Sequence, residues 1–315
     1  TQTRQWDAKG SLGGESLTLS RTEIGDIAAI SAEDGLSMQA GRNIDITGAK
    51  VTSGGGMSLQ AGGDVNLIAN NTYTADSADG GRWGGGLKES EVRGSQASEI
   101  SAGGALGVKA GQDLNLAASQ IGSKGDAALS AGRDINLHTA EQSQRQKTDG
   151  NERIGSGATR SALSSGGDLQ LQAGRDLNSQ AAAIVADNHV GLNAGRDLNL
   201  NAQQSREYQA SHDGGKQQVN DSFRQQGTDI ASGGDTHMQA GRDATLNAAQ
   251  VQAGGDVSVN AGRDITLNSA TESDYSFFEE TKTKKGLLSK TTTHTVKEDY
   301  ATHEKGSLLS GNNVS

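Results

Sequence analysis

The sequence VSVNAGRDITLN, residues 257–268, decides the fold. Apolar side chains alternate with polar ones on both sides of the corner Gly262-Arg263-Asp264. Alternation with a period of two is typical of short β-strands that bury one face. Glycine permits unusual backbone angles and Asp hydrogen-bonds its own turn, so Gly-Arg-Asp is suited to a sharp bend. The segment therefore predicts two short strands joined by a tight corner.

This corner is repeated along the chain. The tetrad Ala-Gly-(Arg, Gly or Gln)-(Asp or Asn) begins at Ala40, Ala61, Ala110, Ala131, Ala173, Ala194, Ala240 and Ala261. Successive spacings are 21, 49, 21, 42, 21, 46 and 21 residues, which makes four pairs with a constant internal spacing. A further apolar position follows the first tetrad of each pair, at Val51, Ile121, Ile184 and Val251. Each 21-residue unit thus supplies three strands, which predicts one coil of a parallel β-helix, or solenoid.

Composition agrees with stacked coils and disagrees with a globular core. Leu, Ile, Val and Phe make up about 17% of the chain, a content that indicates disorder unless a repeat buries them in a narrow column. Proline, which interrupts sheet hydrogen bonding, is absent. Roughly 12 to 15 coils at about 4.8 Å each would give a rod on the order of 55–70 Å.

Longer polar segments separate the pairs of coils, at residues 69–99, 138–162, 201–229 and 268–308. Each has a Gly-containing turn signal near its middle, such as Asp149-Gly150, which is typical of a β-hairpin. We expect projecting hairpin flaps. Residues 1–315 then form one continuous β-helix fragment, with units near 23–99, 100–162, 163–229 and 230–308 that each contain two coils and one flap.

All nine aromatic residues fall in the flaps. They either contact a partner, a glycan or a lipid, or they pack flap against flap, as cross-strand aromatic pairs commonly do. The candidates for partner contacts are Trp83, Tyr208, Phe223, Phe277 and Phe278. The last flap carries six Lys and seven acidic residues between Glu272 and Lys305, and this near balance favours a solvated ribbon over a basic patch.

The tetrads also predict a structural charge ladder. A column of Asp at strand spacing would repel itself, so the neighbouring Arg residues are expected to neutralise it. The ladder residues are Arg133, Asp134, Arg175, Asp176, Arg196, Asp197, Arg242, Asp243, Arg263 and Asp264. The pattern lapses at Arg42-Asn43, Gly63-Asp64 and Gln112-Asp113.

The repeated AGRD(I/L)NL, the preceding GGD(L/V)x(L/V) and the closing KKGLLSKTTTHTVKED with GSLLSGNNV resemble haemagglutinin-repeat exoproteins. The likeness covers essentially the whole chain and is greatest to the downstream repeat region of contact-dependent growth inhibition proteins. It implies a filamentous, right-handed parallel β-helix, two-partner secretion through an outer-membrane transporter, and a place on the bacterial cell surface, or in the periplasm before target contact. It also implies aid in delivering a C-terminal toxin into a target bacterium.

Three functions therefore remain open: a structural delivery filament, an adhesin that binds a glycan or receptor through its flaps, and a glycan-cleaving enzyme. The enzyme is disfavoured, because neither a catalytic constellation nor a paired metal-ligand pattern is found among the six His and the acidic residues. No cofactor is expected. A net charge of −10 argues against nucleic acid as a partner. The expected partners are the secretion transporter, a target-cell envelope or receptor, and further copies of the chain.

Overall fold

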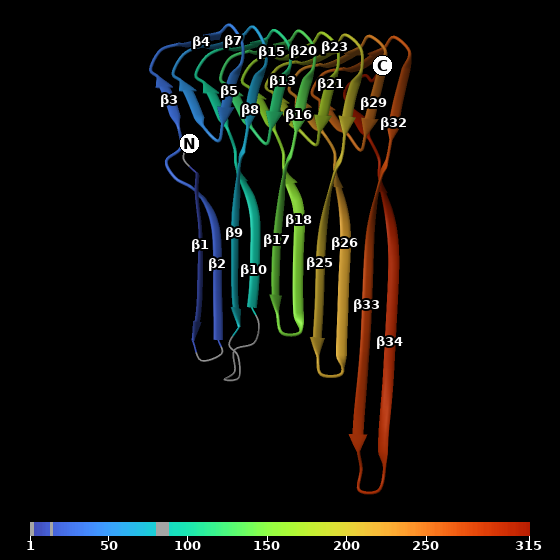
Figure 1. The fold of residues 1–315 in the computed structure, drawn as a ribbon. Coiled ribbons are helices and arrows are strands. Elements are labelled where there is room, and N and C mark those ends of the chain that lie inside the picture. Colours follow the sequence, from blue (N-terminus) through green and yellow to red (C-terminus); the bar gives the residue numbers. More distant parts are fainter. Residues whose placement is uncertain (1–2, 13–14, 80–87) are drawn as a thin grey trace.

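The computed structural model describes residues 3–12, 15–79 and 88–315. Within this part of the chain the structure is built of β-strands without any helix, and the strands form sheets of nine, eight, eight and ten strands (Figure 1). Three sheets are parallel and the fourth is antiparallel. The prediction of an all-β chain with stacked parallel strands is confirmed.

Each passage of the chain through the three parallel sheets is called a coil here. The first sheet contains β3 (Ala29–Ala32), β6 (Lys50–Ser53), β11 (Glu99–Ala102), β14 (Gln120–Ser123), β19 (Ala162–Ser165), β22 (Ala183–Ala186), β27 (Asp229–Ser232), β30 (Gln250–Ala253) and β35 (Leu308–Ser310). The second contains β4 (Leu36–Ala40), β7 (Met57–Ala61), β12 (Leu106–Ala110), β15 (Ala127–Ala131), β20 (Leu169–Ala173), β23 (Val190–Ala194), β28 (Thr236–Ala240) and β31 (Val257–Ala261). The third contains β5 (Ile44–Thr47), β8 (Val65–Ile68), β13 (Leu114–Ala117), β16 (Ile135–His138), β21 (Leu177–Gln180), β24 (Leu198–Asn201), β29 (Asp243–Asn247) and β32 (Asp264–Asn268).

Equivalent residues of successive coils lie side by side. Leu171 in β20 is paired with Leu192 in β23, and Leu246 in β29 is paired with Leu267 in β32. Leu171, Leu192 and Leu246 are fully buried. Because paired strands lie about 4.8 Å apart, each leucine packs on its equivalent in the next coil. The core is therefore a thin column of aliphatic side chains.

The predicted coil number is wrong. The second and third sheets each contain eight strands within the described residues, which span about 34 Å at a spacing of about 4.8 Å. The estimate of 12 to 15 coils was too high because the segments between the pairs of coils add length to the chain without adding strands to the parallel sheets.

Glycines let neighbouring coils approach at the corner that follows each strand of the second sheet. A Cβ atom on Gly174 would lie 2.2 Å from the carbonyl oxygen of Gly132 in the preceding coil, and one on Gly195 would lie 2.2 Å from that of Gly174. Such distances are impossible for a real side chain, so glycine is required where backbone passes directly over backbone.

The corner between the third and first sheets takes two forms. In one coil of each pair, a residue with left-handed backbone angles turns the chain directly into the next strand: Gly48 (φ 51°), Ala118 (φ 49°), Ala181 (φ 53°) and Ala248 (φ 51°). In the other coil the chain leaves the stack at the same corner and enters a hairpin. After β8, for example, the first strand of a hairpin begins at Asn70. The hairpins consequently leave from one edge of the coil stack, one for every two coils.

The hairpin strands form the antiparallel sheet, which we call the hairpin sheet. Its strands are β1 (Thr3–Leu12), β2 (Glu15–Ile24), β9 (Asn70–Asp79), β10 (Lys88–Gln96), β17 (Ala140–Thr148), β18 (Asn151–Thr159), β25 (Gln203–Asp213), β26 (Lys216–Gln226), β33 (Ala270–Lys285) and β34 (Lys290–Lys305). The second strand of each hairpin pairs with the first strand of the next: β2 with β9, β10 with β17, β18 with β25 and β26 with β33. The hairpins therefore lie edge to edge and extend from the coil stack as one continuous layer (Figure 1).

Glycine substitutions test the close stacking of the coils. Gly174→Ala places a Cβ against the Gly132 carbonyl oxygen, so we expect it to lower the free energy of unfolding by about 2 kcal/mol or more in urea titrations. Gly155→Ala is the matched control, because a Cβ at Gly155 in β18 meets nothing within 4 Å. That change should raise stability by about 0.4–1 kcal/mol. Equal losses in the two variants would contradict the backbone contact.

Candidate functional site

The tetrad corner carries a ladder of Arg and Asp side chains, here called the Arg–Asp ladder. The Nε of Arg175 donates a hydrogen bond to Oδ1 of Asp134 in the preceding coil (2.7 Å), and its Nη2 contacts the other carboxylate oxygen. The same bidentate contact joins Arg133 to Asp113, Arg196 to Asp176, Arg242 to Asp197 and Arg263 to Asp243. Each Arg thus reaches back one coil, and the ladder includes Asp113, which the predicted set left out.

Each ladder carboxylate also holds the backbone of the next coil. The amide of Asp176 donates to Oδ1 of Asp134 (3.1 Å), so one carboxylate binds both an Arg and a corner amide. Where Arg is missing, the amide contact continues: the amide of Asp64 donates to Oδ1 of Asn43 (2.9 Å), and the amide of Asp113 to Oδ1 of Asp64 (3.0 Å). The lapses in the pattern therefore remove the ion pair and keep the backbone hydrogen bond.

The ion pairs set the electrostatics of the corner. The hydrogen bonds from Arg175 and Arg242 hold the pKa of Asp134 and of Asp197 below the usual value for a carboxyl group. Asp134 in turn raises the pKa of Arg175. Apart from the exposed Asp264, each ladder carboxylate is bound by an Arg of the next coil, and charge-assisted bidentate contacts of this kind are among the stronger hydrogen bonds in proteins.

A second polar column lies at the corner before the second sheet, and the sequence analysis missed it. The amide of Asp168 donates to Oδ1 of Asp126 (2.9 Å), and the amide of Asp256 to Oδ1 of Asp235 (2.8 Å). His189 takes an Asp position in this column, where its Nδ1 accepts the amide of Asp235 (2.8 Å). The recurring Gly-Gly-Asp before the second-sheet strands was the signal that could have revealed the column.

Buried hydroxyl groups mark the corner from which the hairpins leave, and these were also missed. Ser161 is fully buried, and its Oγ donates to the carbonyl oxygen of His138 (2.9 Å). Equivalent bonds run from the buried Ser98 to Ile68 (2.7 Å) and from the half-buried Ser307 to Asn268 (2.9 Å). A buried hydroxyl without a hydrogen bond is costly, so these bonds stabilise serine at the point where the chain returns from a hairpin to a coil.

The predicted flap aromatics fall on different faces of the hairpin sheet. The guanidinium of Arg206 lies 5.1 Å from the centre of the Tyr208 ring and 5.3 Å from that of Phe223, and it donates two hydrogen bonds of 2.8 Å to Asp221. Both rings are half-buried beside this Arg. The contacts agree with the interpretation that the rings pack within the sheet.

The other flap candidates are not gathered with this pair. Phe277 lies on the same face as Tyr208. Tyr208 pairs with Asp221 and Phe277 pairs with Val219, and residues two apart in a strand point to the same face. Phe278 lies on the opposite face, with the Lys216 ammonium 5.4 Å from its ring centre. Trp83 lies outside the described residues.

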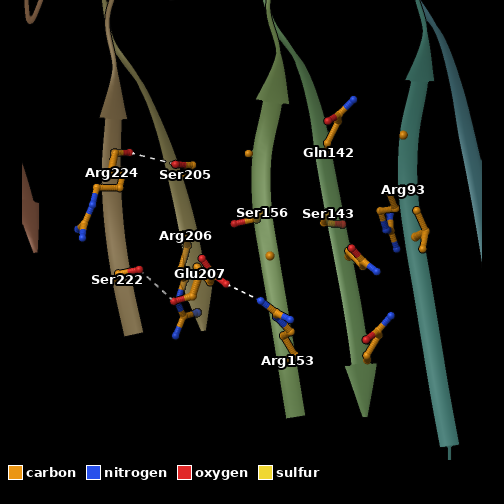
Figure 2. Close-up of a pocket in the computed structure, with 16 residues that line it drawn as sticks. Arg93, Gln142, Ser143, Arg153, Ser156, Ser205, Arg206, Glu207, Ser222 and Arg224 are labelled. Atoms are coloured by element: carbon orange, nitrogen blue, oxygen red, sulfur yellow. Dashed lines mark hydrogen bonds and ion pairs between the residues drawn. The ribbon is translucent and has the colours of Figure 1, made fainter. Parts of the chain in front are cut away.

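A shallow groove of about 830 Å³ crosses the face opposite Tyr208 and Phe223 (Figure 2). Gly155 and Gly157 in β18 form its floor, and Gln144 in β17 and Glu207 in β25 stand on either side. The Glu207 carboxylate accepts a hydrogen bond from Arg153 (2.8 Å), as the dashed line in Figure 2 marks. The groove is therefore a polar depression left by two glycines, and its carboxylate is held by an ion pair.

The described residues hold no group of three or more His, Asp or Glu side chains placed to bind a metal ion. They also form no helix long and apolar enough to cross a membrane. The ladder carboxylates are engaged with Arg side chains and with backbone amides.

Acid titration tests the Arg–Asp ladder. Because the pKa of Asp134 and of Asp197 is lower in the folded chain than in the unfolded one, their ionised forms stabilise the fold at neutral pH. This stabilisation should be lost as pH falls from about 4 through the lower folded values. We expect the melting temperature, followed by circular dichroism, to drop below pH 4 and Asp134→Asn to flatten the drop. Asp213→Asn, in an exposed turn, is the control; identical pH profiles for all three chains would contradict the ladder's contribution.

Known proteins resemble the chain over most or all of its length. The hemagglutinin repeat family model matches residues 4–85, 86–159, 151–220 and 207–286. The tRNA nuclease CdiA of Yersinia mollaretii is 52% identical over 342 aligned positions, which cover 100% of this chain and 11% of that protein. The 16S rRNA endonuclease CdiA of Enterobacter cloacae is 41% identical over 91% of this chain and 9% of its own length. The deoxyribonuclease CdiA of Dickeya dadantii is 39% identical over 100% of this chain and 8% of its own length.

No solved structure matches the chain significantly. The chain spans about a tenth of the length of these curated relatives. The family matches extend over most of the chain, and the relatives share well over a third of its residues. The chain therefore belongs to the hemagglutinin repeat family, as a CdiA-like repeat region.

Proposed function

We propose that the chain is a rod-forming section of a long secreted exoprotein that delivers a toxin in contact-dependent growth inhibition, and that it is not itself an enzyme. The observation that carries the proposal is that relatives named for different nuclease activities share this region. Three CdiA proteins named for action on tRNA, on 16S rRNA and on DNA match 91% to 100% of this chain, although the chain spans only 8% to 11% of each. A region common to three different nucleases is better suited to a shared mechanical role than to any one of their activities.

The proposed architecture is a single right-handed parallel β-helix over residues 1–315, with coils of about 21 residues. It is made of the four units 23–99, 100–162, 163–229 and 230–308, each with two coils and one hairpin. Right-handed crossovers are strongly favoured between parallel strands of one sheet, which supports the handedness. In-register columns of leucine and of Arg–Asp pairs support a stiff rod, because bending would open several columns together.

The proposed setting follows the relatives. The exoprotein is exported by two-partner secretion through an outer-membrane transporter, is displayed on the cell surface or held in the periplasm before contact, and engages the envelope or a receptor of a target cell. Further copies of the chain, associating along the rod, are also proposed as partners. Nucleic acid is not proposed as a partner of this region, because its net charge is −10.

The ladder residues are proposed to be structural. Each bidentate Arg contact neutralises a carboxylate that would otherwise face its equivalent at strand spacing. We do not favour the adhesin alternative, because Tyr208 and Phe223 are packed around Arg206, and Phe278 lies against Lys216.

Deletions in the whole exoprotein test the rod. Removing residues 163–229, one unit of two coils and a hairpin, should allow β18 to pair with β33 and give a shortened rod. Growth inhibition of target cells should then persist at least in part. Removing only residues 162–182, which form one coil, should bring neighbouring hairpins one strand spacing too close to lie edge to edge. We expect this deletion to abolish inhibition.

Surface display and target-cell attachment, measured by flow cytometry, distinguish the alternatives. Loss of attachment in the two-coil deletion would favour the adhesin. Full inhibition by the one-coil deletion would contradict a role for an ordered rod. The proposal assigns this region no nuclease activity of its own. Growth inhibition is therefore measured together with entry of the toxin into target cells.

A further inference from the structure

The last hairpin of the hairpin sheet projects beyond its neighbours (Figure 1). Pairing between β26 and β33 ends at Lys216 and Glu280. Apart from a hydrogen bond from the Thr281 amide to the carbonyl oxygen of Gly215 (2.7 Å), β33 and β34 pair beyond this point only with each other, as far as Lys285 opposite Lys290. We call residues 281–294 the hairpin tip. Five paired positions extend about 17 Å at strand rise, so the tip stands clear of the rest of the described sheet.

Two leucines occupy the end of the hairpin tip. Leu287 and Leu288 have exposed fractions of 102% and 99%, so they touch almost nothing else in the chain. The turns of the two preceding hairpins carry Asp149-Gly150 and Asp213-Gly214 at the corresponding place. A single exposed leucine is ordinary, but an adjacent pair at the most distant point of a polar sheet calls for a partner.

The hairpin also separates the charges of its sequence. Lys282, Lys284, Lys285 and Lys290 lie in the hairpin tip, which has no acidic residue. The seven acidic residues counted in this segment lie between the tip and the coils: Glu272, Asp274, Glu279, Glu280, Glu298, Asp299 and Glu304. The predicted solvated ribbon is present, but its charges are separated in space, because the middle of the segment, with four of the six Lys, lies at the far end of the hairpin.

The lysines surround the tip. Lys282 and Lys284 lie on one face of the hairpin, and Lys285 lies on the other face, directly opposite Lys290. Within the described residues Lys282 forms an ion pair with Glu280 (2.8 Å), and the other three form none. Like charges directly across a strand pair are destabilising, so the arrangement favours an anionic partner over the free state.

We propose that the hairpin tip binds an anionic lipid bilayer. Leu287 and Leu288 enter the boundary between headgroups and acyl chains, and the lysines on both faces bind lipid phosphates around them. A ring of cations behind an apolar point suits insertion of the tip end-on. Basic residues next to apolar ones at an exposed surface are the usual means of binding anionic membranes. This proposal does not depend on toxin delivery, since it concerns a surface of the isolated chain.

Vesicle co-sedimentation of the whole chain tests the proposal. We expect binding to vesicles of phosphatidylcholine mixed with phosphatidylglycerol and much weaker binding to phosphatidylcholine alone. The triple variant Lys284→Gln, Lys285→Gln, Lys290→Gln and the double variant Leu287→Asn, Leu288→Asn should each weaken binding roughly tenfold or more. Leu12→Asn, at a leucine with an exposed fraction of 86%, is the matched control and should bind normally.

A site-specific probe distinguishes insertion from simple charge attraction. The chain has no cysteine, so Leu288→Cys and Asp213→Cys each take one environment-sensitive dye. Anionic vesicles should shift the emission of the dye to shorter wavelength at position 288 and leave it unchanged at 213. Equal binding to neutral vesicles, an unshifted dye at 288, or loss of binding with the lysine variant but not with the leucine variant would overturn the proposal. The last result would indicate a polyanion site without lipid insertion.

Discussion

The structure depends on one distance, the separation of about 4.8 Å between hydrogen-bonded strands. Two coils advance the stack by about 9.6 Å, and a hairpin of two strands is equally wide. One hairpin for every two coils is therefore the ratio at which neighbouring hairpins meet edge to edge. This match explains why β10 finds β17 and why β18 finds β25, and it couples the parallel stack to the hairpin sheet.

The same spacing organises the polar side chains. The corner of one coil lies one strand spacing from the corner of the next, so the polar side chains of each column are paired along the stack. Asp134 achieves this by binding Arg175 and the amide of Asp176 together. His189 maintains its column although it replaces Asp, because its Nδ1 is also a hydrogen-bond acceptor. The polar groups of these columns bind one another rather than standing free to bind a ligand, which agrees with a structural role.

Much of the coil architecture could be predicted from the sequence, because the signal is local and repeated. The tetrad spacing places Leu246 beside Leu267, and period-two alternation identifies which side chains are buried. The partner of each Arg was harder to predict, since the sequence shows Arg175 beside Asp176 while the structure joins it most closely to Asp134. The hairpin sheet could not be predicted, because its pairings join residues some 50 positions apart, as Ser156 with Arg206, with no repeated motif to mark them. Counting charges along the last hairpin likewise concealed their separation in space.

The central claim is that hairpins and coils share one strand register, so that the hairpins form one sheet. The most direct measurement is the distance between spin labels at Thr74→Cys in β9 and Glu207→Cys in β25, by pulsed electron paramagnetic resonance. These positions lie in one cross-strand row, four strand spacings apart, which predicts a narrow distribution of backbone separation near about 19 Å. A broad distribution, or one centred well beyond that value, would show independently moving hairpins and contradict the shared register.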